Sequence, residues 1–142
     1  MMRVLFDANI VLDVLLDRKP WAEASAAAWA AVENGNAIGL LSAHAVTTIH
    51  YLVRKETSGA KALNIMSRIL QVFAVAAVDG SVIQDALQLS CPDFADAVTA
   101  AAARKERCEY IVTRDPKGFR GSPVRALTAE AVLPLLGLHP AS

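Results

Sequence analysis

The sequence is poor in aromatic residues and cysteines and carries no excess of charge of either sign. Aromatic residues make up only 6% of the 142 residues, so aliphatic side chains must fill the core. The two cysteines, Cys91 and Cys108, form no C-x-x-C pattern, which indicates neither a disulfide scaffold nor a zinc site. Basic and acidic residues number 14 each, so bulk charge gives no support to nucleic-acid binding, although a local basic patch could provide it.

Long apolar runs are also missing. No run is long enough to span a bilayer, and the N-terminal apolar run stops at Asp7, which is not typical of a signal peptide. We therefore expect a soluble cytoplasmic protein. Hydrophobic residues make up 54% of the chain, which is enough for a core without disulfides. The length favours a single domain over residues 1–142.

Short apolar segments alternate with longer helix-like segments along the whole chain. We expect strands at Arg3–Asp7, Ala37–Leu41, Phe73–Val78, Tyr110–Thr113 and Val124–Leu127. We expect helices at Ala8–Leu16, Trp21–Glu33, Ser42–Lys55, Ser58–Val72, Gly80–Leu89, from Asp93 to about Lys105, and from Thr128 to about Leu136, with Pro20 in the first turn of the second helix. Strands that are apolar on both faces and alternate with helices predict a three-layer α/β/α sandwich around a mostly parallel sheet.

Aspartates follow two of the expected strands and begin one of the expected helices. Asp7 follows "RVLF" and Asp115 follows "YIVTR", while Asp93 and Asp96 lie three residues apart and therefore share a helix face. In parallel sheets, ligands bind beyond the carboxyl ends of the strands. These four aspartates are therefore the candidates for a functional site.

Each aspartate also has a purely structural interpretation. Asp7 and Asp93 suit helix N-caps, and Asp115 suits an ordinary turn. Asp13 and Asp17 are expected to face solvent.

The aspartates mean more as a set, because carboxylates gathered at one sheet edge would repel one another. Mg²⁺ or Mn²⁺, which prefer carboxylate oxygens and water, would resolve that repulsion. The metal, together with the neighbouring Asn9, would then stabilise a charged Asp7 between two apolar runs.

Four segments in this order resemble the PIN domain: "VLFDANIVLDVLLDR", "LSAHAVTTIHYLVRK", "PDFADAVTAAAA" and "YIVTRDPKGFRGSPV". They are most similar to its bacterial branch, which includes the VapC-type toxins of toxin–antitoxin pairs. The likeness runs from Arg3 to about Leu136. It implies a PIN-like fold and a metal-dependent endoribonuclease, in which clustered acids hold one or two Mg²⁺ or Mn²⁺ ions and a metal-activated water attacks the RNA phosphodiester. It also implies a homodimer and a cognate antitoxin.

The resemblance also implies roles for individual residues. It implies that the metal is bound by Asp7, Asp96 and Asp115, with Asp93 as an auxiliary acid. It further implies that Asn9 orients Asp7, and that Thr113 holds a water or a carboxylate.

The chain departs from the family at one position, because the glutamate usual on the helix after the second strand aligns with Thr48. His50 is the nearest replacement ligand and His44 a weaker one, although a lone helical histidine is more often packed or solvated. The departure keeps a second hypothesis open, that of a PIN-fold module which binds RNA without cutting it. Its candidate RNA contacts are Arg104, Lys105, Arg107, Arg114, Lys117 and Arg120.

A third hypothesis is a phosphatase of the haloacid-dehalogenase type, which also begins with a strand that ends in aspartate. That family has a second aspartate two residues later, where this chain has Asn9. The basic residues at 104–125 also have a purely structural interpretation, namely a solvent-exposed surface that binds no nucleic acid.

Overall fold

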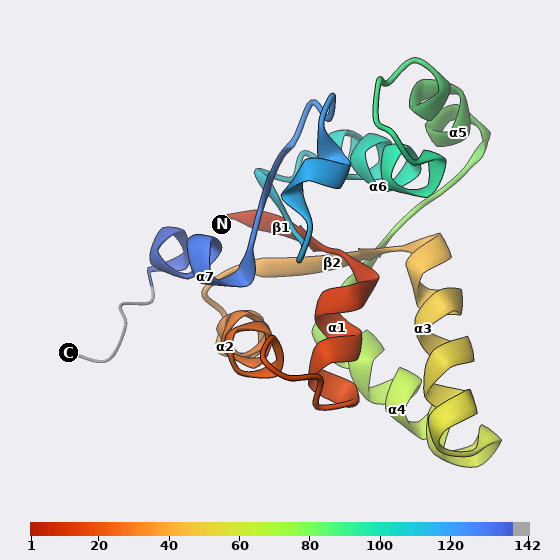
Figure 1. The fold of residues 1–142 in the computed structure, drawn as a ribbon, viewed down its shortest axis with the longest axis vertical. Helices are drawn as coiled ribbons and strands as arrows, with labels where there is room; N and C mark the ends of the chain where they lie inside the picture. Colours follow the sequence, from red (N-terminus) through yellow and green to blue (C-terminus); the bar gives the residue numbers. More distant parts are fainter. Residues whose placement is uncertain (138–142) are drawn as a thin grey trace.

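The structure, a computed structural model, describes residues 1–137 and contains a five-stranded parallel sheet between two layers of helices (Figure 1). The strands are β1 (Arg3–Phe6), β2 (Ile38–Ser42), β3 (Ala74–Ala76), β4 (Tyr110–Val112) and β5 (Arg125–Leu127). The expected α/β/α sandwich is therefore confirmed, with each expected strand within a few residues of its expected bounds. The last five residues of the expected domain, 138–142, lie outside the described residues.

The strand order is β3-β2-β1-β4-β5, so the chain builds outward on one side of β1 and then continues on the other. Such a reversal opens a crevice at the carboxyl ends of the two strands that flank it, here β1 and β4. The register pairs Phe6 with Val112, so Asp7 and Thr113 are the next residues along these neighbouring strands. The topology therefore positions residues from two distant parts of the chain at one sheet edge.

The larger core lies between the sheet and α1 (Ala8–Leu15), α2 (Ala22–Glu33), α3 (Ala43–Glu56), α4 (Gly59–Val72) and α7 (Ala129–Val132). Val4 and Phe6 point into this layer, and the ring of Phe6 meets the edge of Phe73 at a centroid distance of 5.1 Å. β2 passes so close to Phe73 that a Cβ at Gly39 would lie 2.8 Å from its ring. A side chain at Gly39 would therefore separate the sheet from this core.

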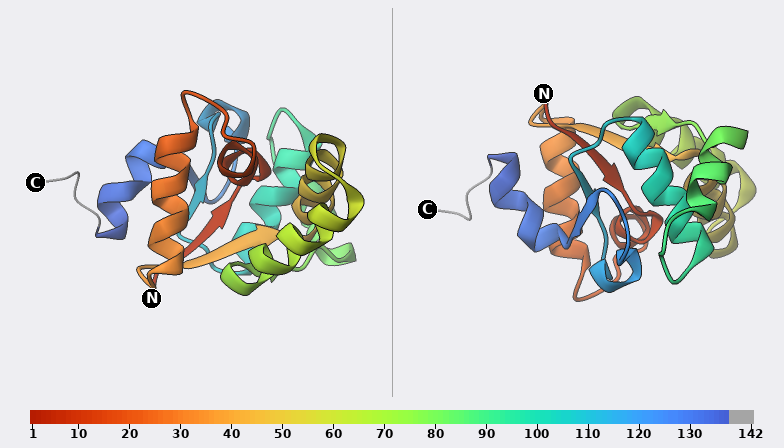
Figure 2. Two further views of the ribbon diagram at one scale, coloured as in Figure 1. Left: turned by 90° about the horizontal axis from the view of Figure 1, so that it is seen from below. Right: turned by 90° about the horizontal axis from the view of Figure 1, so that it is seen from above.

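The opposite layer consists of α5 (Gly80–Leu87) and α6 (Phe94–Lys105), as the views from below and above show (Figure 2). Leu5 of β1 and Ile111 of β4 point into this smaller core. α6 presents a run of buried alanines, 100–103, whose small side chains let the helix lie close to the sheet. Among the described residues, no helix has the length and apolar character needed to cross a membrane.

Two expected details near proline residues are wrong. α2 begins at Ala22, after Trp21 at the N-cap position, so Pro20 precedes the helix instead of occupying its first turn. The expected last helix is α-helical only at Ala129–Val132 and continues as the 3₁₀ helix η2 (Leu133–Leu136). Pro134 explains the change, because proline has no N–H with which to continue the α-helical hydrogen bonds.

Candidate functional site

Asp7 lies at the junction between β1, α1 and β4. Its backbone N–H donates to the Val112 carbonyl at 2.9 Å, and Thr113 Oγ1 donates to Asp7 Oδ2 at 2.8 Å. Burial raises the pKa of Asp7, and the hydrogen bond from Thr113 acts in the opposite direction. The Asp7 carboxylate is therefore held in place at the sheet edge by the strand beside it.

Asp115 joins the same site through the loop that follows β4. Its backbone N–H donates to Thr113 Oγ1 at 3.2 Å, so one buried hydroxyl contacts both Asp7 and Asp115. The loop forms the 3₁₀ helix η1 (Pro116–Phe119), which passes close to two carboxylates. A Cβ at Gly118 would lie 3.0 Å from Asp96 Oδ2 and 3.4 Å from Asp115 Oδ2. Asp96 and Asp115 therefore flank the same point above η1.

Asp93 and Asp96 approach from the start of α6. Asp93 Oδ1 accepts a hydrogen bond from the Asp96 backbone N–H at 3.1 Å, so Asp93 caps the helix. Burial, followed by the charges of Asp7, Asp93 and Asp115, raises the pKa of Asp96 to about 6. The charges of the other three carboxylates all act on Asp96, and Asp96 and Asp115 both approach Gly118, so the four carboxylates lie near one another at the carboxyl ends of β1 and β4; we call this region the acid crevice.

The acid crevice suits a hydrated hard cation better than a closed metal cage. Among residues 1–137, no three His, Cys, Asp or Glu side chains lie close enough together to ligate one ion. Mg²⁺, however, keeps several waters and needs only one or two carboxylates. Asn9 adds a buried Oδ1 that has no hydrogen-bond partner among the described residues. The oxygen ligands present therefore fit Mg²⁺ or Mn²⁺. The expected role of Asn9 is to orient Asp7, but the side-chain hydrogen bond that Asp7 receives comes from Thr113.

The histidine that approaches the acid crevice is His44, at the start of α3. A charge on His44 acts to lower the pKa of Asp7, and its Nε2 lies 3.4 Å from Thr99 Oγ1. Its Nδ1 is buried without a hydrogen-bond partner in the described part of the chain. Thr48 is exposed, and its hydroxyl donates to the His44 carbonyl. No hydrogen bond or ion pair among the described residues links His50 to the acids, whereas the charge of His44 acts on Asp7, so His44 is the stronger candidate of the two.

Asp13 is fully buried, so the expectation that it faces solvent is wrong. α1 packs against α2, where Ser25 Oγ donates to Asp13 Oδ2 at 3.4 Å. Arg114 Nε lies 3.2 Å from the same oxygen, as an ion pair without hydrogen-bond geometry. Burial raises the pKa of Asp13, and the charge of Arg114 opposes that shift. The sequence does carry a signal, because Asp13 lies three residues after the buried Ile10 and so shares its helix face.

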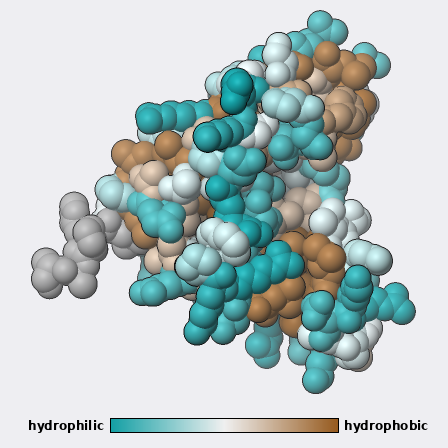
Figure 3. Space-filling model, viewed as in Figure 1, coloured by the Kyte–Doolittle hydropathy of each residue, from teal (hydrophilic) through white to brown (hydrophobic). Residues whose placement is uncertain are grey.

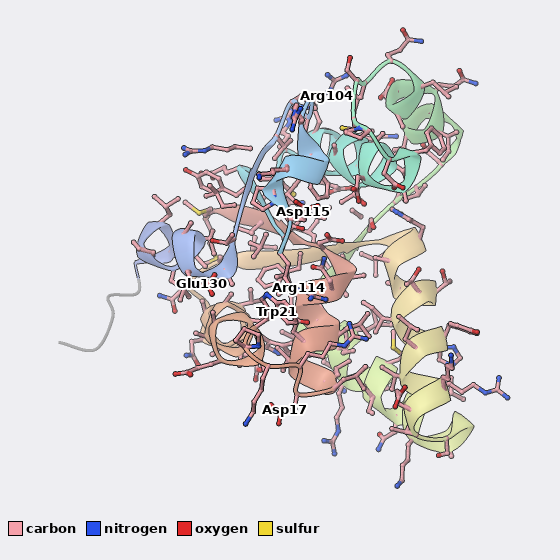
Figure 4. All side chains as sticks on the ribbon, viewed as in Figure 1. Asp17, Trp21, Arg104, Arg114, Asp115 and Glu130 are labelled. Atoms are coloured by element: carbon pink, nitrogen blue, oxygen red, sulfur yellow. The ribbon has the colours of Figure 1, made fainter. Side chains whose placement is uncertain are left out.

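Arg114 also stacks on an aromatic ring, with its guanidinium carbon 4.1 Å from the centre of the Trp21 ring (Figure 4). Figure 4 shows Arg104 well away from Arg114, so the basic residues at 104–125 do not form one compact patch. In the same view, the molecular surface has a hydrophilic band through its middle, between hydrophobic areas (Figure 3). Arg114 and Asp115 project onto the central part of that view.

Comparison with known proteins relates the chain to one protein family. A family model described as PIN domain matches residues 3–117. No curated protein matches the chain.

Solved structures similar to the chain include VapBC2 from Rickettsia felis bound to a promoter DNA fragment. The similarity has a TM-score of 0.68 at 14% sequence identity, and it covers 89% of this chain and 98% of the R. felis chain. A toxin–antitoxin complex from Klebsiella pneumoniae has a TM-score of 0.65 and 22% identity, over 89% and 97% of the two chains. VapC20 from Mycobacterium tuberculosis, a sarcin–ricin loop cleaving toxin, has a TM-score of 0.60 and 15% identity, over 76% and 86%. At these identities the similarity shows a shared fold.

Proposed function

The chain belongs to the PIN domain family, and we propose that it is a metal-dependent endoribonuclease that acts as the toxin of a toxin–antitoxin pair. The observation that carries this proposal is the convergence of Asp7, Asp96 and Asp115 at the crevice between β1 and β4. Three separate segments of the chain contribute to that crevice. A fold with no use for such a site would not gather carboxylates whose charges oppose one another.

One or two hydrated Mg²⁺ or Mn²⁺ ions would each be held by one or two carboxylates drawn from Asp7, Asp96 and Asp115, with Asp93 as an auxiliary acid. When bound, the metal would supply a water of lowered pKa and would stabilise negative charge on the phosphate under attack. Thr113 keeps the Asp7 carboxylate oriented toward the crevice. Asn9, two residues after Asp7, offers as a further oxygen ligand its Oδ1, which has no hydrogen-bond partner within residues 1–137.

RNA and an antitoxin are the partners that we propose. The sarcin–ricin loop cleaved by VapC20 supports RNA as the substrate class. The R. felis and K. pneumoniae structures are complexes of toxins with antitoxins, which supports control of this chain by a separate inhibitor. A homodimer, which the resemblance implies, stays a prediction that gel filtration would test.

The alternative is a PIN-fold module that binds RNA without cutting it. Two observations favour it: Thr48 brings no charge to the position of the usual glutamate, and no three potential ligands in residues 1–137 form a metal-binding group. The chain's membership of the PIN domain family leaves the phosphatase hypothesis without support.

A cleavage assay on a mixed RNA pool separates the two remaining functions. Wild-type protein with Mn²⁺ or Mg²⁺ should cut RNA, and Asp96→Asn or a chelator should abolish the cut. Asp17→Asn is the matched control, because Asp17 is exposed and lies at the opposite end of α1 from Asp7 (Figure 4). Equal cleavage by wild type and Asp96→Asn would reveal a contaminating nuclease. No cleavage with either metal, combined with salt-dependent RNA retention, would favour the binding module.

A further inference from the structure

A recess of about 150 Å³ opens beside the acid crevice, at the carboxyl ends of β4 and β5. We call it the tryptophan recess, and the polar and aromatic residues that line it are Trp21, Ser25, Thr113, Arg114, Thr128 and Glu130. Thr113 belongs to both sites, because its hydroxyl also binds Asp7. The recess therefore adjoins the acid crevice on the side of Asp7.

Arg114 is fixed in this recess from two directions. The fully buried Asp13 pairs with its Nε, and the indole of Trp21 covers one part of the guanidinium. Ser25 in turn donates to Asp13, so α1 and α2 both support the arrangement. Arg114 keeps 24% of its side chain exposed, and its terminal amino groups make no hydrogen bond to any described residue. The guanidinium is thus rigidly held, yet its outer edge is available to an anion.

We propose that the tryptophan recess binds the nucleotide next to the scissile phosphate of the RNA, an inference that rests on the proposed function. The outer edge of Arg114 contacts the phosphate of that nucleotide, since a guanidinium presents parallel donors that match phosphate oxygens. Trp21 is 41% exposed and packs against the base. Single-stranded RNA is commonly bound by stacking bases on aromatic rings and on arginine planes.

The size of the recess agrees with one base. A cavity of about 150 Å³ accommodates a single aromatic ring such as benzene. Carboxylate ligands would also be attracted to Arg114, but a nucleotide offers an anion to Arg114 and an aromatic base to Trp21 in one molecule.

Glu130 gives the recess a chemical preference. It lies on α7 and lines the recess together with Trp21 and Arg114. A carboxylate only accepts hydrogen bonds, which favours a base that carries an amino group. Uracil has a single N–H between two carbonyl acceptors and is disfavoured. The recess therefore selects adenine, guanine or cytosine over uracil beside the cut.

Tryptophan fluorescence tests this inference directly. Wild-type protein in a chelator is titrated separately with the four 5′-ribonucleoside monophosphates and with inorganic phosphate. We expect saturable quenching by AMP, GMP and CMP, with UMP and inorganic phosphate at least about fivefold weaker. Trp29 packs against Phe73 in the core, so Trp21→Phe should remove the signal. Absence of saturable quenching, or equal binding of inorganic phosphate and all four nucleotides, would overturn the proposal.

Arginine variants identify the phosphate contact. Arg114→Lys keeps the charge but loses the planar fork, and it should weaken nucleotide binding about tenfold. Arg68→Lys is the matched control, since Arg68 is exposed on α4, which contacts β3 at the opposite edge of the sheet from β5, and it should bind as wild type does. Equal affinities in the two variants would contradict a role for Arg114.

A second variant tests the recess even if the Arg114→Lys protein fails to fold. Trp21→Leu changes a side chain at the surface, so its fold should persist, which circular dichroism checks. Anisotropy of a labelled single-stranded RNA should show about tenfold weaker binding by Trp21→Leu, and unchanged affinity would overturn the proposal. Both measurements are made in a chelator. Binding without cleavage in the RNA-pool assay would refute only the nuclease, whereas cleavage without nucleotide binding would refute only the recess.

Discussion

Thr113 Oγ1 donates a hydrogen bond of 2.8 Å to Asp7 Oδ2 and so connects residues 106 positions apart in the chain. The same oxygen accepts a hydrogen bond from the Asp115 backbone N–H at 3.2 Å. One threonine thereby links the ends of β1 and β4 to the loop that carries the next acid. The geometry of the acid crevice depends on this buried hydroxyl as much as on the carboxylates themselves.

Thr113→Val, which removes the hydroxyl but keeps the shape, should therefore impair the site. We expect RNA cleavage to fall about tenfold to a hundredfold, because side chains that orient metal ligands have effects of that size. The free energy of unfolding should fall by about 1 kcal/mol. Cleavage kinetics and urea unfolding measure the two effects, and Thr113→Ser should restore both. A Thr113→Val protein with wild-type activity would contradict this role.

Asp96→Asn should stabilise the metal-free protein at neutral pH. The pKa of Asp96 in the folded protein is about 6, above its ordinary value of 3.8, so folding favours the protonated carboxyl. That contribution to stability is present below about pH 4 and is lost as the pH rises through about 6. At pH 7.5 in a chelator, the variant should melt about 2–5 °C above wild type. The difference in melting temperature should shrink toward pH 4 and on addition of Mn²⁺ to wild type. If wild type and Asp96→Asn melt at the same temperature at both pH values, the carboxylates do not repel one another in the folded protein.

The sequence predicts the acid crevice because its members have local signatures. Asp7 and Asp115 follow apolar strands and Asp96 shares a helix face with Asp93, so the parallel topology brings all four to one edge once the strand order is known. The cap made by Asp93 is likewise a local property, since it involves only the next three residues. Features of this kind are visible to periodicity and spacing.

The burial of Asp13 is only partly visible in the sequence, because the helix face that it shares with Ile10 is local but its partner is not. Its burial depends on Arg114, which lies on another element about a hundred residues later, and nothing in the spacing links the two. A charged residue with no visible partner is assigned to solvent, because burial of an unpaired charge is costly. The influence of His44 on Asp7 is equally hard to predict, because it follows from the pairing of β1 with β2 and not from the neighbours of His44 in the chain.

Asp13→Asn should destabilise the protein without changing the size of the side chain. The amide cannot balance the charge of Arg114, and we expect a loss of about 1–2 kcal/mol, less than for a fully buried pair because Arg114 stays partly solvated. Urea unfolding measures the change. Asp17→Asn, at an exposed site, should stay within about 0.5 kcal/mol of wild type. Equal stabilities of the two variants would show that the buried ion pair contributes nothing.

The two cysteines should react at different rates with a thiol reagent. Burial raises the pKa of the Cys108 thiol to about 11, so it is almost entirely protonated at pH 8, whereas Cys91 is partly exposed. The thiolate is the reactive form. We expect Ellman's reagent to label Cys91 first at pH 8 and Cys108 only after unfolding in denaturant. Cys91→Ser should then leave the folded protein almost unreactive, and rapid labelling of that variant would disprove the burial of Cys108.

Thr48→Glu tests whether the position of the usual family glutamate still faces the acid crevice. Thr48 lies one helical turn after His44, whose charge acts on Asp7, and its hydroxyl donates to the His44 carbonyl. A glutamate at position 48 should therefore extend toward the carboxylates and raise the affinity for Mn²⁺ about tenfold, as measured by calorimetry. Thr47→Glu is the matched control, because it adds the same charge to the adjacent exposed position, about 100° around the helix. If only Thr48→Glu raises the affinity for Mn²⁺, the chain has lost one ligand from an otherwise intact site. If both variants bind Mn²⁺ with equal affinity, a carboxylate at position 48 does not reach the metal, and His44 is then the residue of α3 that acts on the acid crevice.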